Sequence, residues 1–360
     1  MKNNKFFRAV RSTAAIPGIA VISLAMMIGL SLFSCGDGAG GGTGGGGSTL
    51  PATSGSVTFS GLGSYEGKYI IAMTGETSVF LCAYDGGNIK EQIAYGAKVS
   101  GGNVTLKVWQ VVSEDNLKDY KGNDKTVKFY VMANSSSSFS PDNYRDPKSM
   151  IGLATVNFTS GAGSGAVAID AHYDLIPYKL TGSTLTFDPF GRDYTPDDPE
   201  CDKYDLVPGT SGTFPIGKWE NQHNNSTWYE AVEFKADGYL VSYMSGTTSI
   251  TQTGNSSSGT FTIYGENIPY KHSGNILTFN PMRRGNGFKE YTPDDPECDQ
   301  WTLVSGSGAF PIGKWAGQDN DPFWGEWVEF KAGNIMVHEW ESTSTYLDNT
   351  TGGYLRIFKW

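Results

Sequence analysis

Hydrophobic and polar residues alternate with a period of two along much of this chain. Between residues 228 and 234, the even positions are Trp, Glu, Val and Phe, and the odd positions are Tyr, Ala and Glu. This alternation is typical of strands that bury one face, because successive side chains point to opposite sides. We find no run with the i, i+3, i+4, i+7 spacing of an amphipathic helix. The pattern predicts an all-β protein with short strands and Gly-, Ser-, Asn- and Pro-rich turns.

A strand-rich unit of a little over ninety residues occurs twice in the second half of the chain. Three pairs of matching segments mark the two copies: IPYKLTGSTLTFDP (176–189) with IPYKHSGNILTFNP (268–281), GTFPIGKW (212–219) with GAFPIGKW (308–315), and WYEAVEFKA (228–236) with WGEWVEFKA (324–332). Several strands of this length in series predict an antiparallel meander.

The acidic motif YTPDDPECD occurs in both copies, at residues 194–202 and 291–299. In each copy it separates two apolar strands, and its prolines interrupt the hydrogen bonding of a ladder. We therefore predict a solvated turn. Two other readings stay open: a catalytic role, and a weak Ca²⁺ contact, although the acids do not follow the order of an EF-hand loop. The Ca²⁺ reading would use the four carboxylates of Asp197, Asp198, Asp294 and Asp295.

The motif GKW occupies residues 217–219 and 313–315, and a Glu-Phe-Lys-Ala hairpin follows it in both copies. This arrangement resembles the small lipocalin-like domains of exported bacterial proteins. The resemblance implies closed antiparallel barrels in which the tryptophan, here Trp219 or Trp315, plugs one end beneath a basic residue of the last strand. Arg356 is the residue expected to stack on Trp315.

These patterns divide the chain into five segments: a signal peptide (1–35), a Gly-rich tether (36–54), an N-terminal β-domain (55–208), a first lipocalin-like repeat (209–305) and a second repeat (306–360). The N-terminal domain fits either a β-sandwich or a divergent barrel. Its last strands, at 173–206, resemble the repeat. The second repeat is therefore either shortened or completed by a permuted boundary near residue 170.

The first segment has the charge order of a secretory signal. Residues 2–11 carry four basic side chains, and residues 14–33 carry no charge. The apolar run ends in Leu-Phe-Ser-Cys at Cys35, which resembles the lipobox of bacterial lipoproteins. We expect Cys35 to be lipidated and the globular part to lie outside the cytoplasm, at the outer membrane or cell surface. An uncleaved membrane helix is the alternative, because twenty apolar residues can span a bilayer.

Charge limits the partners of the exported protein. Removal of residues 1–34 leaves 23 basic and 37 acidic residues, a net charge of −14. This charge disfavours nucleic acid and anionic lipid. We expect attachment to a membrane through the lipid anchor, no nucleic-acid partner, and a small apolar or glycan ligand.

Cysteine and histidine spacings do not indicate a metal site or a cofactor. The four histidines (His172, His223, His272 and His338) stand alone, and no phosphate loop or nucleophile motif is present. If Cys35 is lipidated, three cysteines remain: Cys82, Cys201 and Cys298. An odd number leaves at least one of them unpaired within a monomer. We expect free thiols, because tandem domains would hold Cys201 and Cys298 too far apart for a disulfide unless the two copies face each other.

The candidate ligand-binding residues are two glutamates, four tryptophans and one arginine of the repeats: Glu230, Glu326, Trp219, Trp228, Trp315, Trp324 and Arg356. Both glutamates fall in phase with Val and Phe on the expected inward face. A buried carboxylate is costly unless it is paired, so each needs a structural partner or a ligand. The tryptophans are expected to fill the core first and to contact a ligand second.

We therefore expect a non-enzymatic protein that binds a ligand or mediates adhesion through its lipocalin-like domains. A wide barrel interior would favour ligand binding, and a packed interior would favour adhesion. The first alternative is a cell-envelope hydrolase that uses carboxylates from different strands, since acids three apart on one strand face opposite sides. The second alternative is a surface repeat protein stabilised by Ca²⁺.

Overall fold

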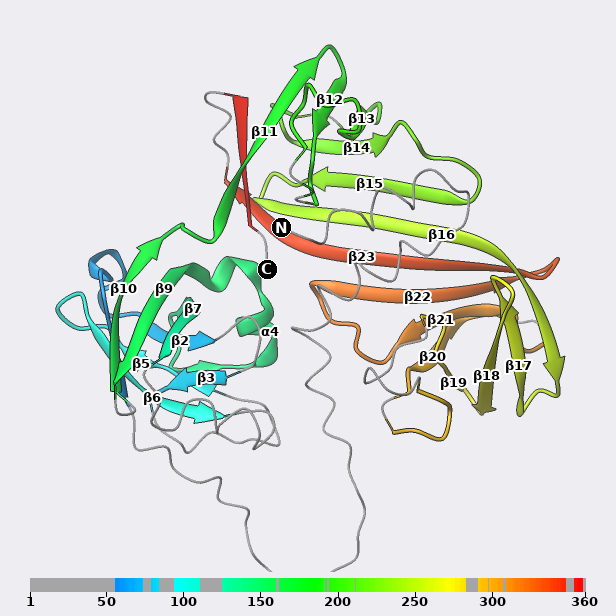
Figure 1. Ribbon diagram of the computed structural model, residues 1–360, viewed down its shortest axis with the longest axis horizontal. Coiled ribbons are helices and arrows are strands. Elements are labelled where there is room, and N and C mark those ends of the chain that lie inside the picture. Colours follow the sequence, from blue (N-terminus) through cyan, green and yellow to red (C-terminus); the bar gives the residue numbers. More distant parts are fainter. Residues whose placement is uncertain are drawn as a thin grey trace, which may run out of the picture. The chain divides into compact units, whose positions relative to one another are not determined.

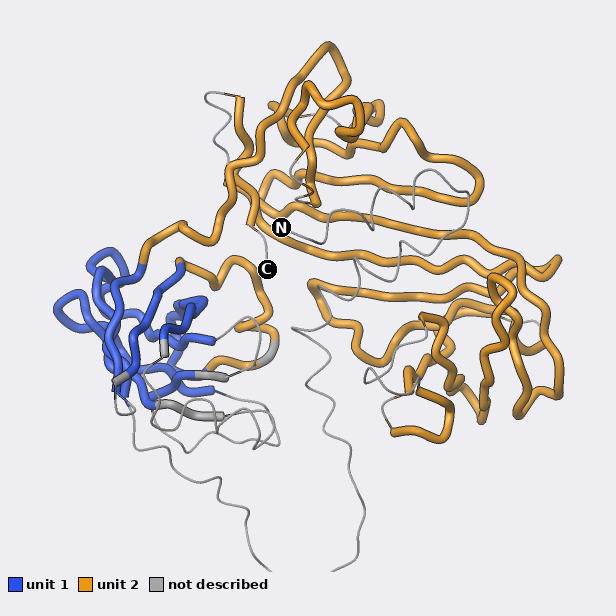
Figure 2. Tube along the Cα trace, viewed as in Figure 1, with its two compact units in different colours: residues 1–138, 153–167, 360 blue, residues 139–152, 168–359 orange. Residues whose placement is uncertain are grey.

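The computed structural model describes residues 56–73, 79–83, 94–110, 125–159, 162–190, 192, 194–210, 212–282, 291–296, 298–306, 309–347 and 353–358. The expected signal peptide, Cys35 and the tether lie outside the described residues. The chain divides into two compact units (Figure 2): unit 1 holds residues 1–138, 153–167 and 360, and unit 2 holds residues 139–152 and 168–359. Among the described residues, no helix is long and apolar enough to cross a membrane.

The strands up to residue 169 are β1 (Ser56–Ser60), β2 (Tyr69–Met73), β3 (Val79–Cys82), β4 (Ala94–Tyr95), β5 (Ala97–Lys98), β6 (Val104–Gln110), β7 (Lys125–Asn134), β8 (Ser138–Phe139), β9 (Met150–Thr159) and β10 (Ala162–Ile169). One sheet has the order β3-β6-β1-β10-β9-β7-β2-β5, and a further pairing of β2 with β3 closes seven of these strands into a barrel. Strand β1 runs parallel to β10 and antiparallel to β6. The structure thus selects a barrel over a sandwich for this domain.

Unit 2 contains fourteen consecutive strands: β11 (Tyr173–Thr181), β12 (Thr184–Phe187), β13 (Lys203–Leu206), β14 (Gly217–Asn221), β15 (Trp228–Phe234), β16 (Tyr239–Gly254), β17 (Ser258–Ile263), β18 (Glu266–Ser273), β19 (Ile276–Phe279), β20 (Gln300–Ser305), β21 (Gly313–Gly317), β22 (Trp324–Lys331), β23 (Ile335–Leu347) and β24 (Tyr354–Phe358). Each strand pairs with the next, and β24 returns to β11, so the strands form a closed ring. The predicted all-β fold of antiparallel barrels is confirmed.

A further pairing, between β16 and β23, crosses this ring and divides it into two circuits of eight strands. Figure 1 shows β16 and β23 side by side through the middle of unit 2. We name the circuit β11–β16 with β23 and β24 barrel A, and the circuit β16–β23 barrel B. Each barrel has its own aromatic core, which includes Phe187, Tyr204, Trp219 and Phe234 in barrel A and Phe261, Phe279, Trp301, Trp315 and Phe330 in barrel B.

The two sequence copies exchange their last strands between the barrels. By the sequence repeat, the first copy comprises β11–β17 and the second comprises β18–β24. The far end of β16, residues 250–254, pairs with β17 in barrel B. Strand β24 pairs with β11 and with the end of β23, and so belongs to barrel A. Each barrel is therefore completed by a strand from the other copy.

Because of this exchange, the domain boundaries expected at residues 208 and 305 do not separate the two barrels. The first boundary falls between β13 and β14, and the second between β20 and β21, but both are pairs of hydrogen-bonded neighbours within one barrel. Residues 173–206 lie in barrel A of unit 2 and not in the N-terminal domain. The physical reason is that β11 finds its second partner, β24, at the other end of the sequence.

A short helical segment also packs in unit 2. It consists of α4 (Pro141–Arg145) and the 3₁₀ turn η4 (Pro147–Ser149). The hydroxyl of Tyr239, at the start of β16, donates to Asp146 at 3.0 Å, and the ammonium of Lys148 lies 3.5 Å from the centre of the Tyr239 ring. Arg145 forms an ion pair with Asp321 at 3.1 Å.

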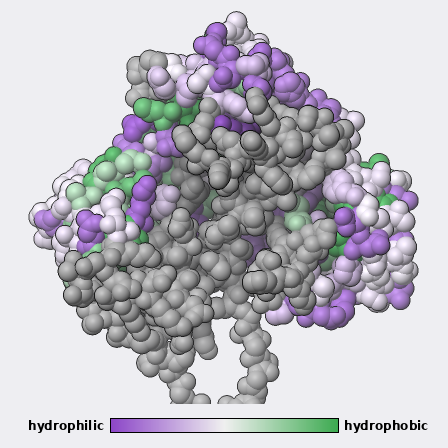
Figure 3. Space-filling model, in the orientation of Figure 1, coloured by the Kyte–Doolittle hydropathy of each residue, from purple (hydrophilic) through white to green (hydrophobic). Residues whose placement is uncertain are grey.

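On the face of the molecule shown in Figure 3, the described surface is mainly hydrophilic, and hydrophobic side chains form small separate patches. The large hydrophobic residues that are most exposed are Leu175 and Val304, at 62% and 55%. Isolated exposed residues of this kind are normal for a protein surface.

The two shared strands predict that the barrels unfold together. Phe187 in barrel A and Phe279 in barrel B are equivalent in the repeat and fully buried. Replacing either with Ala should reduce the free energy of unfolding by about 3–5 kcal/mol. Both variants should shift one common transition, followed by tryptophan fluorescence, because seven of the nine tryptophans lie between residues 219 and 340. Two separable transitions, each sensitive to only one substitution, would contradict the shared architecture.

Candidate functional site

The pairing of four neighbouring strands places the two buried glutamates in one cross-strand row. Glu230 of β15 is opposite Met244 of β16, Met244 is opposite Trp340 of β23, and Trp340 is opposite Glu326 of β22. Met244 and Trp340 are equivalent in the two copies, since both copies are offset by 96 residues here. A pseudo-two-fold axis therefore passes between these two side chains.

The rows on either side complete the site. One row holds Trp228, Gly246 and His338, and the other holds Ser242, Ser342 and Trp324. All these positions are even-numbered, so their side chains share one face of β15, β16, β23 and β22. We name this set the central face: Trp228, Glu230, Ser242, Met244, Gly246, Trp324, Glu326, His338, Trp340 and Ser342. Trp228, Met244, Trp324 and the serines are half-buried, and both glutamates are buried.

In barrel A, neutral side chains hold the carboxylate of Glu230. The hydroxyl of Tyr204 donates a short hydrogen bond to Oε1, and Nδ2 of Asn221 donates to the same oxygen at 2.9 Å. Burial, followed by the neighbouring Glu230 carboxylate, raises the pKa of Tyr204 well above its usual value. Tyr204 is therefore a hydroxyl donor to Glu230 at neutral pH.

In barrel B, different side chains hold the equivalent Glu326. Nε2 of His338 lies 2.6 Å from Oε1 of Glu326, and the indole Nε1 of Trp340 donates to the same oxygen at 3.2 Å. The indole of Trp301 stands edge-on to His338 with ring centres 5.9 Å apart. The two halves of the central face thus share a carboxylate but differ in the groups that hold it.

A symmetric backbone contact fixes both glutamates. The amide of Glu230 donates to Oδ1 of Asn224 at 2.7 Å, and Nδ2 of Asn224 donates back to the Glu230 carbonyl at 2.9 Å. Asn320 makes the same two contacts with Glu326, at 2.8 and 3.0 Å. Each asparagine lies in the turn before its glutamate-bearing strand and ties that turn to it.

The tryptophans of the GKW motifs lie apart from the central face. Trp219 and Trp315 are 3% and 2% exposed, in the cores of barrels A and B. Each indole donates to the carbonyl of the proline four residues earlier at 3.0 Å. Phe214 and Phe310 stand edge-on to them. These tryptophans fill the cores, as a structural role requires.

The prediction that Arg356 stacks on Trp315 is wrong, because the strand exchange places the two residues in different barrels. Arg356 lies on β24 in barrel A, whereas Trp315 belongs to barrel B. Its neighbours Leu355 and Ile357 are buried in the core, so Arg356 points outward. Its guanidinium lies over Tyr173, 5.7 Å from the ring centre, and 3.8 Å from Asp170.

Aromatic rings pack the interiors of both barrels. In barrel B, Phe261 stacks on Tyr270 and on Phe330, with ring centres 4.3 and 5.0 Å apart. In barrel A, Phe187 lies 5.2 Å from Tyr204, and Phe234 lies 5.0 Å from Tyr346. A ligand inside either barrel would have to displace these rings.

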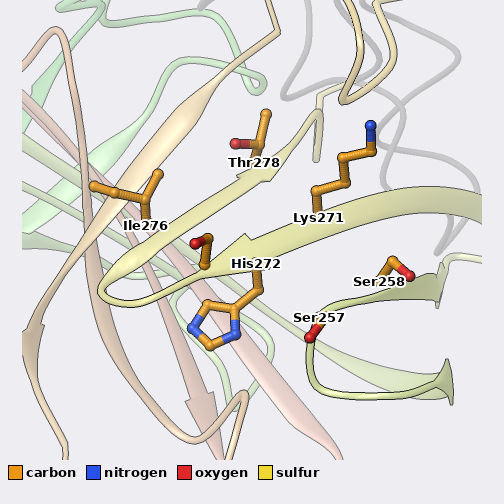
Figure 4. A pocket seen from close by; sticks show the side chains of 7 residues that line it. Ser257, Ser258, Lys271, His272, Ile276 and Thr278 are labelled. Carbon is orange, nitrogen blue, oxygen red and sulfur yellow. The ribbon is translucent and has the colours of Figure 1, made fainter.

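A shallow depression lies on the outer wall of barrel B (Figure 4) and is lined by Ser257, Ser258, Lys271, His272, Ser273, Ile276 and Thr278. Lys271 forms an ion pair with Asp294. In Figure 4 the His272 ring points away from Lys271 and Thr278. That ring stacks on Phe310 at 4.2 Å and contacts the carbonyls of Ser256 and Gly274. The side chains of Lys271 and His272 are thus engaged within the protein.

The repeated acidic motif forms the predicted turn in both copies. The carboxylate of Asp198 accepts the amide and hydroxyl of Thr195 at 2.6 and 2.9 Å, and Asp295 accepts the same groups of Thr292 at 2.7 and 2.8 Å. The exposed Asp197 forms an ion pair with Lys179. Within the described ranges, no group of three or more His, Cys, Asp or Glu side chains is arranged to hold a metal ion.

Cys82, Cys201 and Cys298 are buried, and none of the three forms a disulfide within the described residues, as predicted. Burial raises the pKa of Cys82 and of Cys298 to about 12. His172 is also buried, and burial lowers its pKa to about 4.

Several residues of the site were not among the sequence candidates. They are Tyr204, Asn221, Met244, His338 and Trp340. Trp228 and Trp324 are equivalent positions of the repeat, 96 residues apart. The same offset in the next strand makes Met244 equivalent to Trp340. That relation becomes a contact only through the pairing of β16 with β23. Comparison with family models, curated proteins and solved structures finds no match to the chain.

The Tyr204–Glu230 contact gives a stability prediction. Tyr204→Phe removes the hydroxyl that donates to a buried carboxylate. The free energy of unfolding should fall by about 1–3 kcal/mol, because Glu230 loses a donor that water cannot replace. Urea denaturation at neutral pH measures this. The matched control is Tyr354→Phe, at a residue that is 44% exposed, which should change stability by less than about 0.5 kcal/mol. Equal losses in both variants would contradict the role of the buried hydroxyl.

Proposed function

We propose that this is an exported, lipid-anchored, non-enzymatic protein that binds its ligand on the central face of the double barrel. The observation that carries the proposal is the strand register, which brings Trp228, Glu230, Trp324 and Glu326 onto one face of four adjacent strands. These four residues, chosen from the sequence as ligand contacts, form two pairs that belong to the two copies and are 96 residues apart in the chain.

The packed barrel cores disfavour the internal cavity of a typical lipocalin, and the proposed site is the half-buried part of the same inward face, around Trp228, Met244 and Trp324. Ring contacts of 4.3–5.2 Å occupy both cores. The central face instead combines half-buried Trp and Met side chains with Ser hydroxyls and two fixed carboxylates. Aromatic rings with a few polar groups around them are the usual chemistry of a small-ligand or glycan site.

The geometry gives less support to a hydrolase. Glu230 and Glu326 are three strands apart, so their Cα atoms are separated by about 14 Å at the normal strand spacing. Carboxyl groups that share a glycosidic bond lie within about 9.5 Å of each other, and here the side chains of Met244 and Trp340 stand in the same row between the two glutamates. Each glutamate also has its own partners on opposite sides of the axis. The carboxylates are therefore proposed as binding groups.

The proposed lipid anchor is tested by replacing Cys35. In the native host, radiolabelled palmitate should enter the wild-type protein, and Cys35→Ser should abolish the label and release the protein from the membrane fraction. Cys82→Ser is the matched control and should keep the label. Label that persists in Cys35→Ser, or an intact mass that includes residues 1–34, would contradict the anchor.

The proposed site is tested by removing one indole at a time. Trp324→Ala should weaken binding at least tenfold, measured by calorimetry against a panel of cell-envelope glycan fragments and long-chain fatty acids, because buried aromatic contacts dominate such sites. Trp228→Ala should have a similar effect. Trp327→Ala is the matched control, since Trp327 is on the same strand but on the opposite face, beside Lys314. Equal losses in Trp324→Ala and Trp327→Ala, or no binding by any probe, would contradict the proposal.

A further inference from the structure

We infer that an acid-sensitive clasp holds barrel A closed, and that protonation of His172 releases strand β24 from this clasp. We name as the clasp the four side chains of His172, Tyr173, Thr345 and Phe358. None of the four belongs to the central face, so the clasp gives the protein a conformational property separate from the proposed ligand site.

The clasp lies at the seam that closes barrel A. The seam is the pairing of β11 with β24, which consists of five residue pairs from Tyr173 with Phe358 to Pro177 with Tyr354. Figure 1 shows the red strand β24 alongside β11. Among the described strands β24 is the last, so it can leave the seam while the other strands of the ring keep their pairing.

Side chains hold β24 in the seam in addition to the backbone ladder. The hydroxyls of Tyr173 on β11 and Thr345 on β23 are hydrogen-bonded at 3.1 Å, which joins the two strands that flank β24. The hydroxyl of Ser344 donates to the carbonyl of Phe358 at 2.6 Å. The ring of His172 lies 4.3 Å from the ring of Tyr173 and 5.2 Å from that of Phe358, between ring centres.

The environment of His172 suits only a neutral ring. The residue is 4% exposed, and neither Nδ1 nor Nε2 has a hydrogen-bond partner in the part of the chain that the structure describes. A protonated imidazole has two N–H donors and a positive charge, and burying these groups without an acceptor is costly. Burial is accordingly the main cause that lowers the pKa of His172 to about 4.

The charged and titratable groups around His172 do not offset this cost. Asp170, in the turn before β11, favours the charged ring, whereas the guanidinium of Arg356 on β24 opposes it. That guanidinium lies 3.8 Å from Asp170 and so compensates part of its charge. Tyr173 keeps its proton, because burial raises its pKa. The contact from β23 is the uncharged hydroxyl of Thr345.

The sign of the pH dependence follows from these contacts. A solvated imidazole has a pKa of about 6.5, and the closed seam lowers the pKa of His172 to about 4. The opened state therefore binds a proton more readily than the closed state. The clasp is fully effective above about pH 6.5 and weakens as the pH falls towards 4. Release of β24 leaves the ladder between β16 and β23 in place, because the two strands pair independently of β24.

Hydrogen exchange of the full mature protein tests the clasp. Protection factors, which remove the intrinsic pH dependence of exchange, are measured by mass spectrometry for peptides that cover β24 and β15. Between pH 7 and pH 5 the protection of β24 should fall by about tenfold or more, whereas β15 should keep its protection. His172→Phe keeps an aromatic ring without titratable nitrogens, so β24 should stay protected at pH 5. The matched control is His223→Phe, at an exposed histidine, which should show the wild-type loss.

An NMR titration of the wild-type protein tests the same clasp without a substitution. The His172 ring should be neutral at pH 6, where a solvated imidazole is mostly protonated. A charged His172 at pH 6 would overturn the clasp. So would unchanged protection of β24 in the wild type at pH 5, an equal loss in the wild type and in His172→Phe, or an equal loss in β24 and β15.

Discussion

The pairing of β16 with β23 is the constraint on which the rest of unit 2 depends. Eleven consecutive residue pairs, from Tyr239 with Thr345 to Ser249 with Ile335, join the two strands. Each strand also serves as a wall of both barrels. Without this ladder the fourteen strands would form one wide ring with no reason to enclose two separate cores. With it, each barrel closes around its own aromatic cluster, and no strand in either circuit is left with an open edge.

The same ladder creates the candidate site. It joins the equivalent faces of two copies and places Met244 against Trp340, with a fixed carboxylate on each side. The two halves have since diverged: neutral donors hold Glu230, and an imidazole with an indole holds Glu326. The packed barrels act as rigid supports that position this site.

Much of the fold follows from local patterns in the sequence. Period-two alternation predicted the strands and placed Glu230 inward with Val232 and Phe234, and the prolines of the acidic motif predicted its turn. The strand exchange could not be predicted in this way, because alternation fixes which face a residue occupies but not which strand lies beside it. Arg356 is in the other barrel from Trp315 for that reason. His338 was likewise an isolated histidine until the register placed it beside Glu326.

A cross-link between the two central strands tests this account most directly. Ser242 and Ser342 are paired, and both are small and half-buried. With all native cysteines replaced, Ser242→Cys and Ser342→Cys together should form an intramolecular disulfide, seen by peptide mass mapping, because directly paired residues have Cα atoms about 4.5–5.5 Å apart. The control pair, Ser242→Cys with Thr345→Cys, is out of register and on opposite faces, and should stay reduced. A disulfide in the control but not in the Ser242–Ser342 pair, or in neither, would contradict the shared ladder.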